Sequence, residues 1–185
     1  MKGSVKEYDT GFLLSGIYKR HYSKALYCKV WSFVADCLKK EDKILDLGCG
    51  PGQFANMLFD RGFKNYVGID FSTVAIEMAQ KRVPFFTFIT DDLNNVNFRK
   101  YAGFKFVSTE CFEHVENDLQ LLEKLPKGSD ILFSVPNYMA KYHVRKFPNQ
   151  KFIKKYYRSV LNVNKITTFV VWKAGRIFVV EAKII

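Results

Sequence analysis

The sequence predicts an α/β fold in which a parallel sheet is covered by helices and ends in an antiparallel hairpin. From residue 43 to residue 135, short apolar runs of strand-like composition alternate with helix-like segments, which is typical of parallel strands joined by crossover helices. Residues 166–184 instead give two β-rich runs around Lys173-Ala174-Gly175, a hairpin signal. With 185 residues and no internal repeat or linker, we expect one domain, residues 1–185.

The individual elements follow from local composition and from helix-ending residues. Amphipathic helical patterns occupy residues 18–38, so residues 1–42 are expected to form a helical lid ahead of a core at residues 43–185. The predicted strands are residues 43–47, 65–69, 85–89, 104–108 and 131–135. The predicted helices are residues 53–60, 72–82, 117–125 and 152–161. Gly62 ends the first of them, Ser72 is the N-cap of the second, and Pro126 closes the third.

Composition argues against several classes of protein. No apolar run approaches the ~20 residues that a membrane helix needs, and the first residues lack the apolar stretch of a signal peptide. The four cysteines show no CxxC spacing, so neither a disulfide framework nor a zinc site is expected. Reduced thiols and a cytoplasmic location are the corresponding expectation.

The positive charge is concentrated at the C-terminal end. Residues 126–185 hold 12 Lys and Arg against 2 Asp and Glu, a net of +10, whereas residues 1–125 hold 17 against 16, a net of +1. Such a run is either a solvated surface or a ring of positive charge that attracts an anionic partner. Nucleic acid is one such partner. An acceptor pocket here would have an open mouth rimmed by basic residues: Lys141, Arg145, Lys146, Lys151, Lys154 and Lys155.

The first predicted strand runs directly into a glycine-rich bend, "LDLGCGPG", residues 45–52. Ligands of a parallel sheet sit at the carboxyl ends of its strands, and glycines let a ligand approach the backbone closely. The bend lacks the Gly-Lys-Ser/Thr ending of a phosphate-binding loop, and Gln53 stands where a dinucleotide fingerprint has its third glycine. Asp46, just before the glycines, suits a ligand that carries an ammonium and a sulfonium.

"LDLGCGPG" followed by "VGIDFS", residues 67–72, resembles the first two signature segments of class I S-adenosylmethionine (SAM)-dependent methyltransferases. More narrowly, the chain resembles the ubiquinone-biosynthesis O-methyltransferases and the methyltransferase type 11 and 23 group. The resemblance covers nearly the whole chain from about Lys43 onward. It implies a Rossmann-like, doubly wound, seven-stranded sheet with helices on both faces and a C-terminal antiparallel hairpin. It also implies SAM as cofactor and methyl transfer as activity.

The resemblance also assigns roles to the residues that would hold the cofactor. Asp46 would lie near its methionine part, and Asp70 would accept hydrogen bonds from both ribose hydroxyls. Four small residues would pass their backbone beside it: Gly48, Cys49, Gly50 and Gly52. Phe71 would pack on the adenine. In "FITDDLNN", residues 88–95, the adenine amino group would bind Asp92, with a backbone contact from Leu93. If the motif is aligned one residue earlier, Asp91 takes the place of Asp92; it is the register alternative.

A second candidate cluster lies in "STECFEHVEND", residues 108–118. Glu110, Glu113 and His114 are spaced i, i+3 and i+4, which places them on one face of a helical turn. Two carboxylates and one imidazole could hold a divalent cation such as Mg²⁺ or Mn²⁺. Without a metal, Glu110 would contact cofactor or substrate, Glu113 and His114 would build the pocket wall, and His114 could act as general base.

The same array resembles that of the enzymes that methylate the 3′-terminal ribose 2′-hydroxyl of small RNAs. In those enzymes a further histidine completes the metal site, and His143 could take that part here. Its alternatives are a residue that gates the pocket, because "HVRKF" resembles a stretch found after the fifth strand in relatives, and a solvated residue of a basic loop. The catalytic candidates are therefore Glu113, His114 and His143.

The sequence favours one function and leaves two alternatives. The leading hypothesis is SAM-dependent O-methylation of a small hydroxylated acceptor, with an anionic acceptor favoured by the basic residues. The first alternative is a metal-assisted RNA ribose 2′-O-methyltransferase, and the second is a non-catalytic, SAM-binding regulatory protein. Tyrosines of the N-terminal segment are candidates for the inner face of the lid: Tyr8, Tyr18, Tyr22 and Tyr27.

Overall fold

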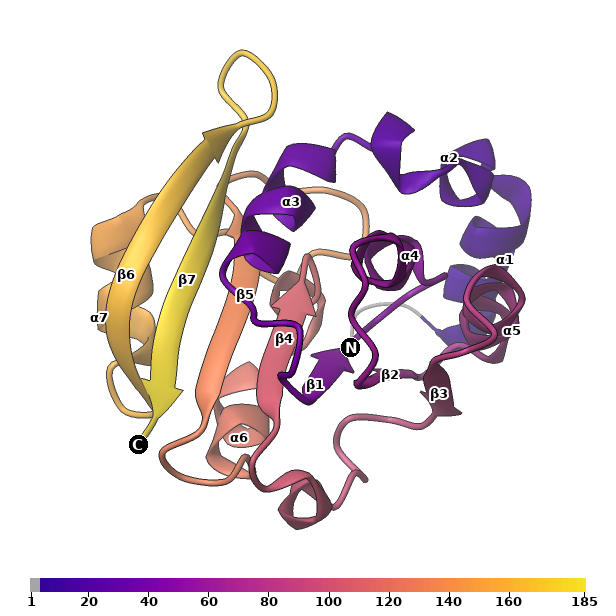
Figure 1. Ribbon diagram of the computed structural model, residues 1–185. Helices are drawn as coiled ribbons and strands as arrows, with labels where there is room; N and C mark the ends of the chain where they lie inside the picture. The colour runs from indigo at the N-terminus through magenta and orange to yellow at the C-terminus, as the bar shows by residue number, and fades with distance from the viewer. Residues whose placement is uncertain (1–3) are drawn as a thin grey trace. The chain divides into compact units, whose positions relative to one another are not determined.

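The computed structural model describes residues 4–185, so the first three residues of the predicted lid lie outside the described part (Figure 1). Its seven strands follow the order β3-β2-β1-β4-β5-β7-β6. This order, with β7 antiparallel to β5 and to β6, confirms the predicted α/β fold class and its C-terminal antiparallel pair. The chain divides into two compact units, residues 4–96 and residues 97–185, which are described separately. The single domain stays a prediction.

The N-terminal unit contains three parallel strands, five α-helices and one 3₁₀ turn. Its strands are β1 (Ile44–Leu47), β2 (Tyr66–Asp70) and β3 (Thr87–Thr90), with β2 in the middle. Its helical segments are α1 (Val5–Leu14), α2 (Gly16–Lys19), α3 (Cys28–Asp36), α4 (Gln53–Asp60) and α5 (Thr73–Arg82), with a short 3₁₀ turn, η1 (Tyr22–Lys24), between α2 and α3. All four residues of β1 are buried, as expected for an inner parallel strand.

Two boundaries in this unit differ from the sequence prediction. Helix α1 precedes the predicted helical segment 18–38; Ser4 and Glu7 start it with a capping box, which satisfies two backbone N–H groups at the helix start. Strand β3 begins at Thr87 rather than at residue 85. Pro84 follows the end of α5, and Phe85 is 79% exposed, so this stretch turns at the surface before the strand starts.

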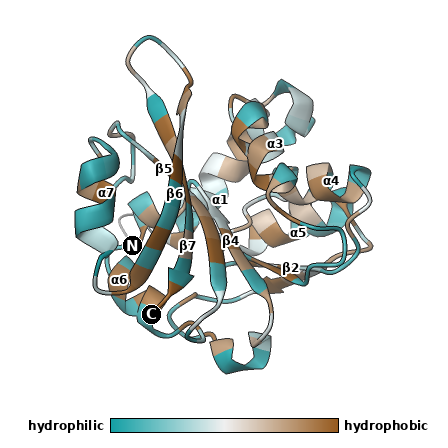
Figure 2. Ribbon diagram, turned by 60° about the vertical axis from the view of Figure 1, so that its left-hand side comes forward, coloured by the Kyte–Doolittle hydropathy of each residue, from teal (hydrophilic) through white to brown (hydrophobic). Residues whose placement is uncertain are grey.

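The C-terminal unit contains the hairpin. Its strands are β4 (Lys105–Thr109), β5 (Asp130–Pro136), β6 (Leu161–Val170) and β7 (Arg176–Ile184), where β4 and β5 are parallel and β7 is antiparallel to both of its neighbours. Its helical segments are η2 (Phe98–Tyr101), η3 (Phe112–His114), α6 (Asp118–Glu123) and α7 (Gln150–Tyr157). Figure 2 shows α7 as mostly hydrophilic with an apolar stripe, in agreement with its buried Ile153 and Tyr157.

Two predictions for this unit were wrong in detail. The helix predicted at residues 152–161 is α7, which starts two residues earlier because the Asn149 side chain accepts a hydrogen bond from the Phe152 N–H at 2.9 Å. It ends at Tyr157, and Leu161 already belongs to β6. The helical turn predicted for Glu110 to His114 is a 3₁₀ turn that begins only at Phe112, so Glu110 lies outside it.

Within residues 4–185, no helix combines the length and the apolar character that crossing a bilayer would require.

Candidate functional site

The glycine-rich bend after β1 is held to the end of β2 by backbone hydrogen bonds. The N–H groups of Gly48 and Cys49 both donate to the carbonyl of Ile69, at 2.8 and 3.0 Å. Gly48, Gly50 and Gly52 have φ angles of 78°, 51° and 74°, in the left-handed region that side chains disfavour. Among the described residues, no heavy atom lies within 4 Å of a Cβ built on Gly50, so the bend leaves open space at that position.

Cys49 and Gly52 show why the bend is built from these residues. A Cβ on Gly68 of β2 would lie 2.8 Å from the Cys49 sulfur, so the Cys49 side chain packs onto β2 and only its backbone lines the bend. A Cβ on Gly52 would lie 2.8 Å from the Cβ of Ala79. Gly52 therefore permits the close approach of α5 and the start of α4.

Asp46 is a buried carboxylate with one unsatisfied oxygen. Its side chain is 1% exposed, and its Oδ2 accepts a hydrogen bond from the Tyr66 hydroxyl at 2.6 Å. Its Oδ1 has no hydrogen-bond partner among the described residues. Burial raises the pKa of Asp46 to about 7, and the Tyr66 hydrogen bond offsets only part of this. A cationic or hydrogen-bond-donating ligand would satisfy such a group.

Asp70, the last residue of β2, is bonded to the bend itself. Its Oδ2 accepts from the Gly50 N–H at 2.9 Å and its Oδ1 from the Ser72 N–H at 2.9 Å. Burial raises the pKa of Asp70 to about 6, although the two backbone hydrogen bonds lower it. Each carboxylate oxygen can accept a second hydrogen bond, so the predicted contact with ribose hydroxyls is compatible with these bonds and stays a prediction.

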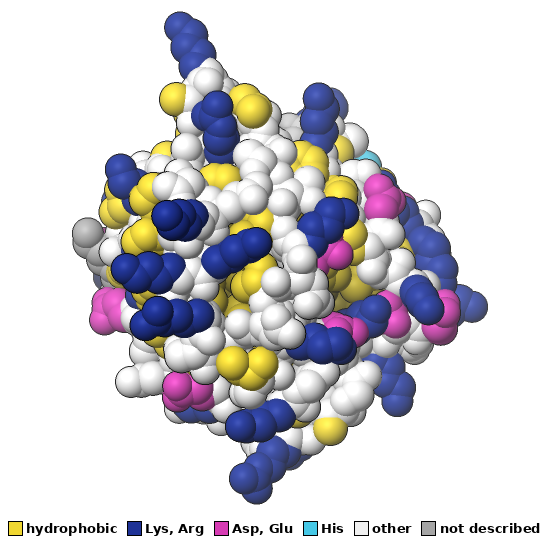
Figure 3. All heavy atoms as spheres, turned by 90° about the vertical axis from the view of Figure 1, so that its left-hand side faces the viewer, with side chains coloured by type: hydrophobic (Ala, Val, Ile, Leu, Met, Phe, Trp, Pro, Cys, Tyr) yellow, Lys and Arg dark blue, Asp and Glu magenta, His cyan; other side chains and the backbone are white. Residues whose placement is uncertain are grey.

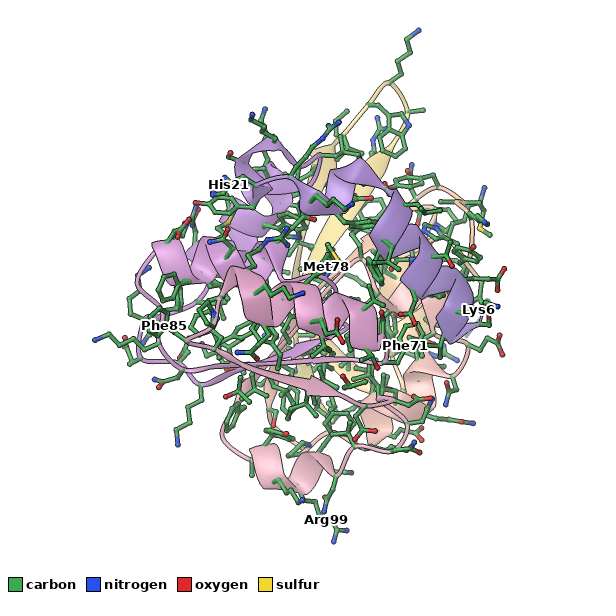
Figure 4. The ribbon with its side chains drawn as sticks, turned by 90° about the vertical axis from the view of Figure 1, so that its right-hand side faces the viewer. Lys6, His21, Phe71, Met78, Phe85 and Arg99 are labelled. Atoms are coloured by element: carbon green, nitrogen blue, oxygen red, sulfur yellow. The ribbon has the colours of Figure 1, made fainter. Side chains whose placement is uncertain are left out.

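The predicted lid packs beside these residues within the N-terminal unit. Helix α1 runs alongside α5, and Phe71 lies at the start of α5 (Figure 4). The Tyr8 ring meets the Phe71 ring edge-on, with centroids 5.1 Å apart. The Ser72 hydroxyl donates to the Asp9 carboxylate and accepts from the Ala75 N–H at the start of α5. Asp9 thus joins α1 to the N-cap of α5, a contact that the sequence analysis missed.

Two further side chains tie the segment after α1 to the bend. The Gln53 amide donates to the carbonyls of Ile17 and Arg20, at 3.3 and 2.9 Å. The Arg82 guanidinium donates to the carbonyl of Pro51, within the bend, and to that of Tyr18 at 2.7 Å. Gln53 therefore has its own structural role at the position where a dinucleotide fingerprint has glycine.

The segment predicted to contact adenine forms a surface turn. The exposed Asp92 side chain accepts hydrogen bonds from the N–H and the amide of Asn94, both at 2.9 Å. Leu93 is buried. Asp91, the register alternative, donates its N–H to the carbonyl of Asp70 at 3.0 Å. Asp91 is thereby fixed beside Asp70, and the adenine contacts of this turn stay a prediction.

In the C-terminal unit, Glu110 follows β4 in an unusual backbone conformation. Its φ is 54°, a region that few residues other than glycine adopt and that is enriched at functional sites. Ser134 of β5 holds it there: the Ser134 hydroxyl accepts from the Glu110 N–H at 3.0 Å and donates to Oε1 at 2.8 Å. Burial raises the pKa of Glu110 to about 7, and the hydrogen bond from the Ser134 hydroxyl offsets only part of this.

Glu113, His114 and His143 form a tight group. One ligand atom from each lies within 4.8 Å of the others, and the two imidazole rings meet edge-on with centroids 4.6 Å apart. Glu113 is 1% exposed, and neither carboxylate oxygen has a hydrogen-bond partner among the described residues. Glu110 does not belong to this group, whereas the downstream His143 does.

The hydrogen bonds of the two histidines fix their tautomers. Nδ1 of His114 faces the carbonyl of Tyr142, and Nδ1 of His143 faces that of Tyr138, both at 3.2 Å. A carbonyl only accepts, so each Nδ1 carries the proton and each Nε2 carries the lone pair. Burial and the neighbouring His143 lower the pKa of His114 to about 4, and burial lowers that of His143. Both rings are therefore neutral at pH 7.

Arg145 orders the backbone that carries this group. Its guanidinium donates to the carbonyls of Phe112 and Glu116, at 2.9 and 2.7 Å, and pairs with Asp118 at 3.2 Å. The next residue upstream, Val144, donates its N–H to the carbonyl of Glu113 at 2.8 Å. Arg145 was predicted to belong to the basic rim of an open acceptor pocket, but its guanidinium is bonded to these carbonyls and its side chain is only 18% exposed.

Other basic residues of the C-terminal unit do lie at the surface. Figure 3 looks onto the side that bears α7 and β6 and shows many Lys and Arg side chains there but few acidic ones. Of the basic residues predicted to rim the pocket, the exposed ones are Lys141, Lys146, Lys151, Lys154 and Lys155.

Comparison with known proteins agrees with this geometry. Residues 44–127 match the model of a family described as a methyltransferase domain. Residues 44–127 are therefore similar in sequence to methyltransferase domains. The match spans the glycine-rich bend, Asp70, Glu113 and His114, which are the signature segments on which the sequence analysis relied.

The relatives that this chain matches differ in the reactions their names describe. Over 87 residues, 46% of this chain, it is 30% identical to a trans-aconitate 2-methyltransferase of Rhizobium etli and spans 34% of that protein. Over 139 residues, 69% of this chain, it is 26% identical to a malonyl-[acyl-carrier protein] O-methyltransferase of Ilyobacter polytropus and spans 49% of it. The chain thus spans between a third and a half of these two relatives.

Among solved structures, one with a similar fold covers nearly the whole chain. The N-methyltransferase NodS of Bradyrhizobium japonicum, solved with S-adenosyl-L-homocysteine (SAH), superposes with a TM-score of 0.72 at 15% identity. The superposition covers 98% of this chain and 99% of NodS.

Proposed function

We propose that this protein transfers a methyl group from SAM to a hydroxyl of a small acceptor. The observation that carries the proposal is the pair of buried carboxylates at the glycine-rich bend. Asp46 has one oxygen with no partner among the described residues, and Asp70 is bonded to the Gly50 N–H. The ammonium of the cofactor's methionine part is a group that would satisfy Asp46. The matching methyltransferase domain model supports the same interpretation.

The remaining residues of the bend suit the rest of the cofactor. The open space beside Gly50 would admit the adenosyl part close to the backbone. Asp70 would accept hydrogen bonds from the ribose hydroxyls, and the Phe71 ring, supported edge-on by Tyr8, would offer a flat apolar face to the adenine. SAM supplies the reactive sulfonium methyl when it is bound.

Methyl transfer to a hydroxyl needs a proton acceptor. The acceptor oxygen forms a bond to the methyl carbon, the sulfur–carbon bond breaks, and SAH leaves with the electron pair. The hydroxyl proton must go to a base in the same step or before it. The lone pairs on Nε2 of His114 and His143, which their Nδ1 hydrogen bonds orient, leave these neutral histidines able to accept that proton. This favours a hydroxyl acceptor over a carboxylate, which needs no base.

A second candidate function rests on the Glu113, His114 and His143 group. A buried carboxylate without a hydrogen-bond partner beside two histidines is a suitable metal site. Both Nδ1 atoms are bonded to carbonyls, the arrangement usual behind metal-binding histidines. Two imidazoles and one carboxylate favour Mn²⁺ or a later transition metal over Mg²⁺. A bound metal ion would acidify an acceptor hydroxyl, including a ribose 2′-hydroxyl.

Three measurements test these proposals. Calorimetry with SAH should show binding, and incubation of the protein and radiolabelled SAM with fractionated cell extract should label small molecules under the first function and RNA under the second. Labelling of neither fraction, with SAH binding retained, would favour the non-catalytic alternative. Elemental analysis of the purified protein, compared between wild type and Glu113→Gln, tests the metal independently of activity. Equal metal content in the two proteins would exclude this site.

A further inference from the structure

The tip of the β6–β7 hairpin extends beyond the carboxyl end of β5. Pro136, the last residue of β5, is paired with Ile177 of β7, and the pairing of β6 with β7 continues to Val170 and Arg176. The turn at residues 171–175 therefore projects past the end of β5 (Figure 1). This is the same strand end that carries Ser134, the partner of Glu110.

Asn137 fixes this tip in place. Its N–H donates to the carbonyl of Arg176 at 2.9 Å, its side-chain oxygen accepts from the Arg176 N–H at 2.8 Å, and its amide donates to the carbonyl of Ala174 at 3.1 Å. The turn closes on itself through Val171 and Gly175. These hydrogen bonds hold the tip as a rigid extension of the strand end.

The tip presents one large aromatic ring. The Trp172 side chain is 44% exposed, although Gly175 and Tyr138 pack against it. A Cβ on Gly175 would lie 2.3 Å from the indole ring, so the ring lies against the bare Gly175 backbone. The Tyr138 ring also packs against it, with centroids 4.3 Å apart and ring planes inclined at 52°. A supported but exposed indole is a typical stacking platform.

Tyr138 connects this platform to the candidate catalytic group. Its ring centroid lies 6.0 Å from that of His143, and its carbonyl holds Nδ1 of His143. The His143 ring in turn contacts that of His114. Trp172, Tyr138, His143 and His114 thus form a continuous series of ring contacts from the surface to the candidate base, all within the C-terminal unit.

The charge around the platform is positive. Between Asp130 and Glu181 the sequence has no acidic residue. Lys173 lies next to Trp172 on the exposed turn, and Arg176 is half-buried at the base of the tip. Lys141, in the loop that also carries His143, is exposed. An anionic group on a ring stacked at Trp172 would meet only positive or neutral side chains from this segment.

We propose that Trp172 is the acceptor-binding platform, and that the acceptor is a planar-ring compound bearing a hydroxyl and an anionic group. This inference rests on the proposed function and names its substrate class. Two sources share this chemistry, hydroxylated aromatic acids and nucleotides. The indole stacks on the ring, and Lys173 and Arg176 favour the negative charge.

The two tryptophans of the chain make the platform directly observable. Trp31 lies in α3 of the N-terminal unit and is 7% exposed, so a Trp31→Phe variant leaves Trp172 as the only indole. This variant, saturated with SAH, is titrated with 3,4-dihydroxybenzoate, guanosine 5′-monophosphate or citrate, with correction for absorption by the ligand. Quenching by either ring compound, without quenching by citrate, supports the proposal and identifies the source. No quenching by either ring compound, or equal quenching by citrate, would overturn it.

Variants separate stacking from folding. Trp172→Ala should weaken binding of the ring compound about tenfold, about 1.4 kcal/mol, as measured by calorimetry, and Trp172→Phe should retain most of it. Lys124→Ala, an exposed cation outside the segment, serves as control. Unchanged affinity in Trp172→Ala overturns the inference. SAH binding without ring binding refutes the platform alone, whereas ring binding without methyl transfer to any acceptor refutes the proposed function alone.

Discussion

The Gly50 N–H donates to the Asp70 carboxylate at 2.9 Å, so the glycine-rich bend and the predicted ribose-binding residue form one hydrogen-bonded structure. Asp70 therefore has two roles. It would bind ligand, and it already fixes the backbone along which the ligand is expected to lie.

Replacing Asp70 with Ala should weaken SAH binding. The change removes the predicted hydrogen bonds to ribose and releases the Gly50 N–H, and charge-assisted hydrogen bonds contribute about 1.5–3 kcal/mol each. We expect a loss of affinity of roughly tenfold to a hundredfold in calorimetry. Glu77→Ala, an exposed acidic residue on α5, should bind SAH like the wild type. Equal affinity in the Asp70 variant would remove it from the cofactor site.

Two glycines with similar backbone angles should differ in their tolerance of alanine. Gly52 and Gly62 have φ angles of 74° and 82°, so both substitutions carry the cost of a left-handed alanine, about 1 kcal/mol. Only at Gly52 would the new Cβ also collide with Ala79, at 2.8 Å, which adds about 1–3 kcal/mol of overpacking. Denaturant unfolding should therefore show Gly52→Ala as clearly the less stable variant, and equal stabilities would contradict the close approach of α5.

The sequence predicted most strands and the glycine-rich bend because these features are local. Alternating composition and the glycines of residues 48–52 are visible without knowledge of the fold. The contacts between distant segments were not visible. Asp9 and Gln53 look like ordinary polar residues until Ser72 and the carbonyls of Ile17 and Arg20 are brought beside them.

The cluster of Glu113, His114 and His143 was predicted in part, but the argument that predicted it differs from the geometry that brings its residues together. Helical spacing suggested that Glu110, Glu113 and His114 share a face, but the φ of 54° at Glu110 breaks that geometry. The resemblance to known enzymes named His143, and the loop after β5 brings it to His114. Arg145 was misread because the direction of a side chain in a basic run depends on acceptors some thirty residues away.

Arg145 should matter for turnover rather than for cofactor affinity. Lysine keeps the charge but cannot reproduce a guanidinium that reaches several carbonyls of residues 112–116 at once, so Arg145→Lys should let Glu113 and His114 shift. Small displacements of reacting groups can cost up to about a hundredfold in rate. We expect methyl transfer to fall roughly tenfold to a hundredfold, with SAH affinity unchanged. Lys146→Ala, an exposed neighbour, is the matched control, and wild-type turnover in Arg145→Lys would refute a positioning role.

Asp46 should make the stability of the ligand-free protein depend on pH. Burial raises the pKa of Asp46 to about 7, so folding favours its protonated form. The stabilisation that the protonated Asp46 contributes is complete below about 3.9, the pKa of an aspartate in the unfolded chain. It is lost as the pH rises through about 7, the pKa of Asp46 in the folded protein. Asp46→Asn resembles the protonated form at every pH. Relative to wild type, its free energy of unfolding should therefore rise between pH 4 and pH 8, by at most about 4 kcal/mol.

The comparison isolates Asp46, since the other groups that titrate in this range are present in both proteins. Burial also raises the pKa of Asp70 and of Glu110, but these contributions cancel in the difference, apart from the repulsion between Asp46 and Asp70. The measurement is urea unfolding at both pH values. A constant difference between Asp46→Asn and wild type would mean that Asp46 is ionised throughout, and that its unsatisfied oxygen is stabilised without a ligand.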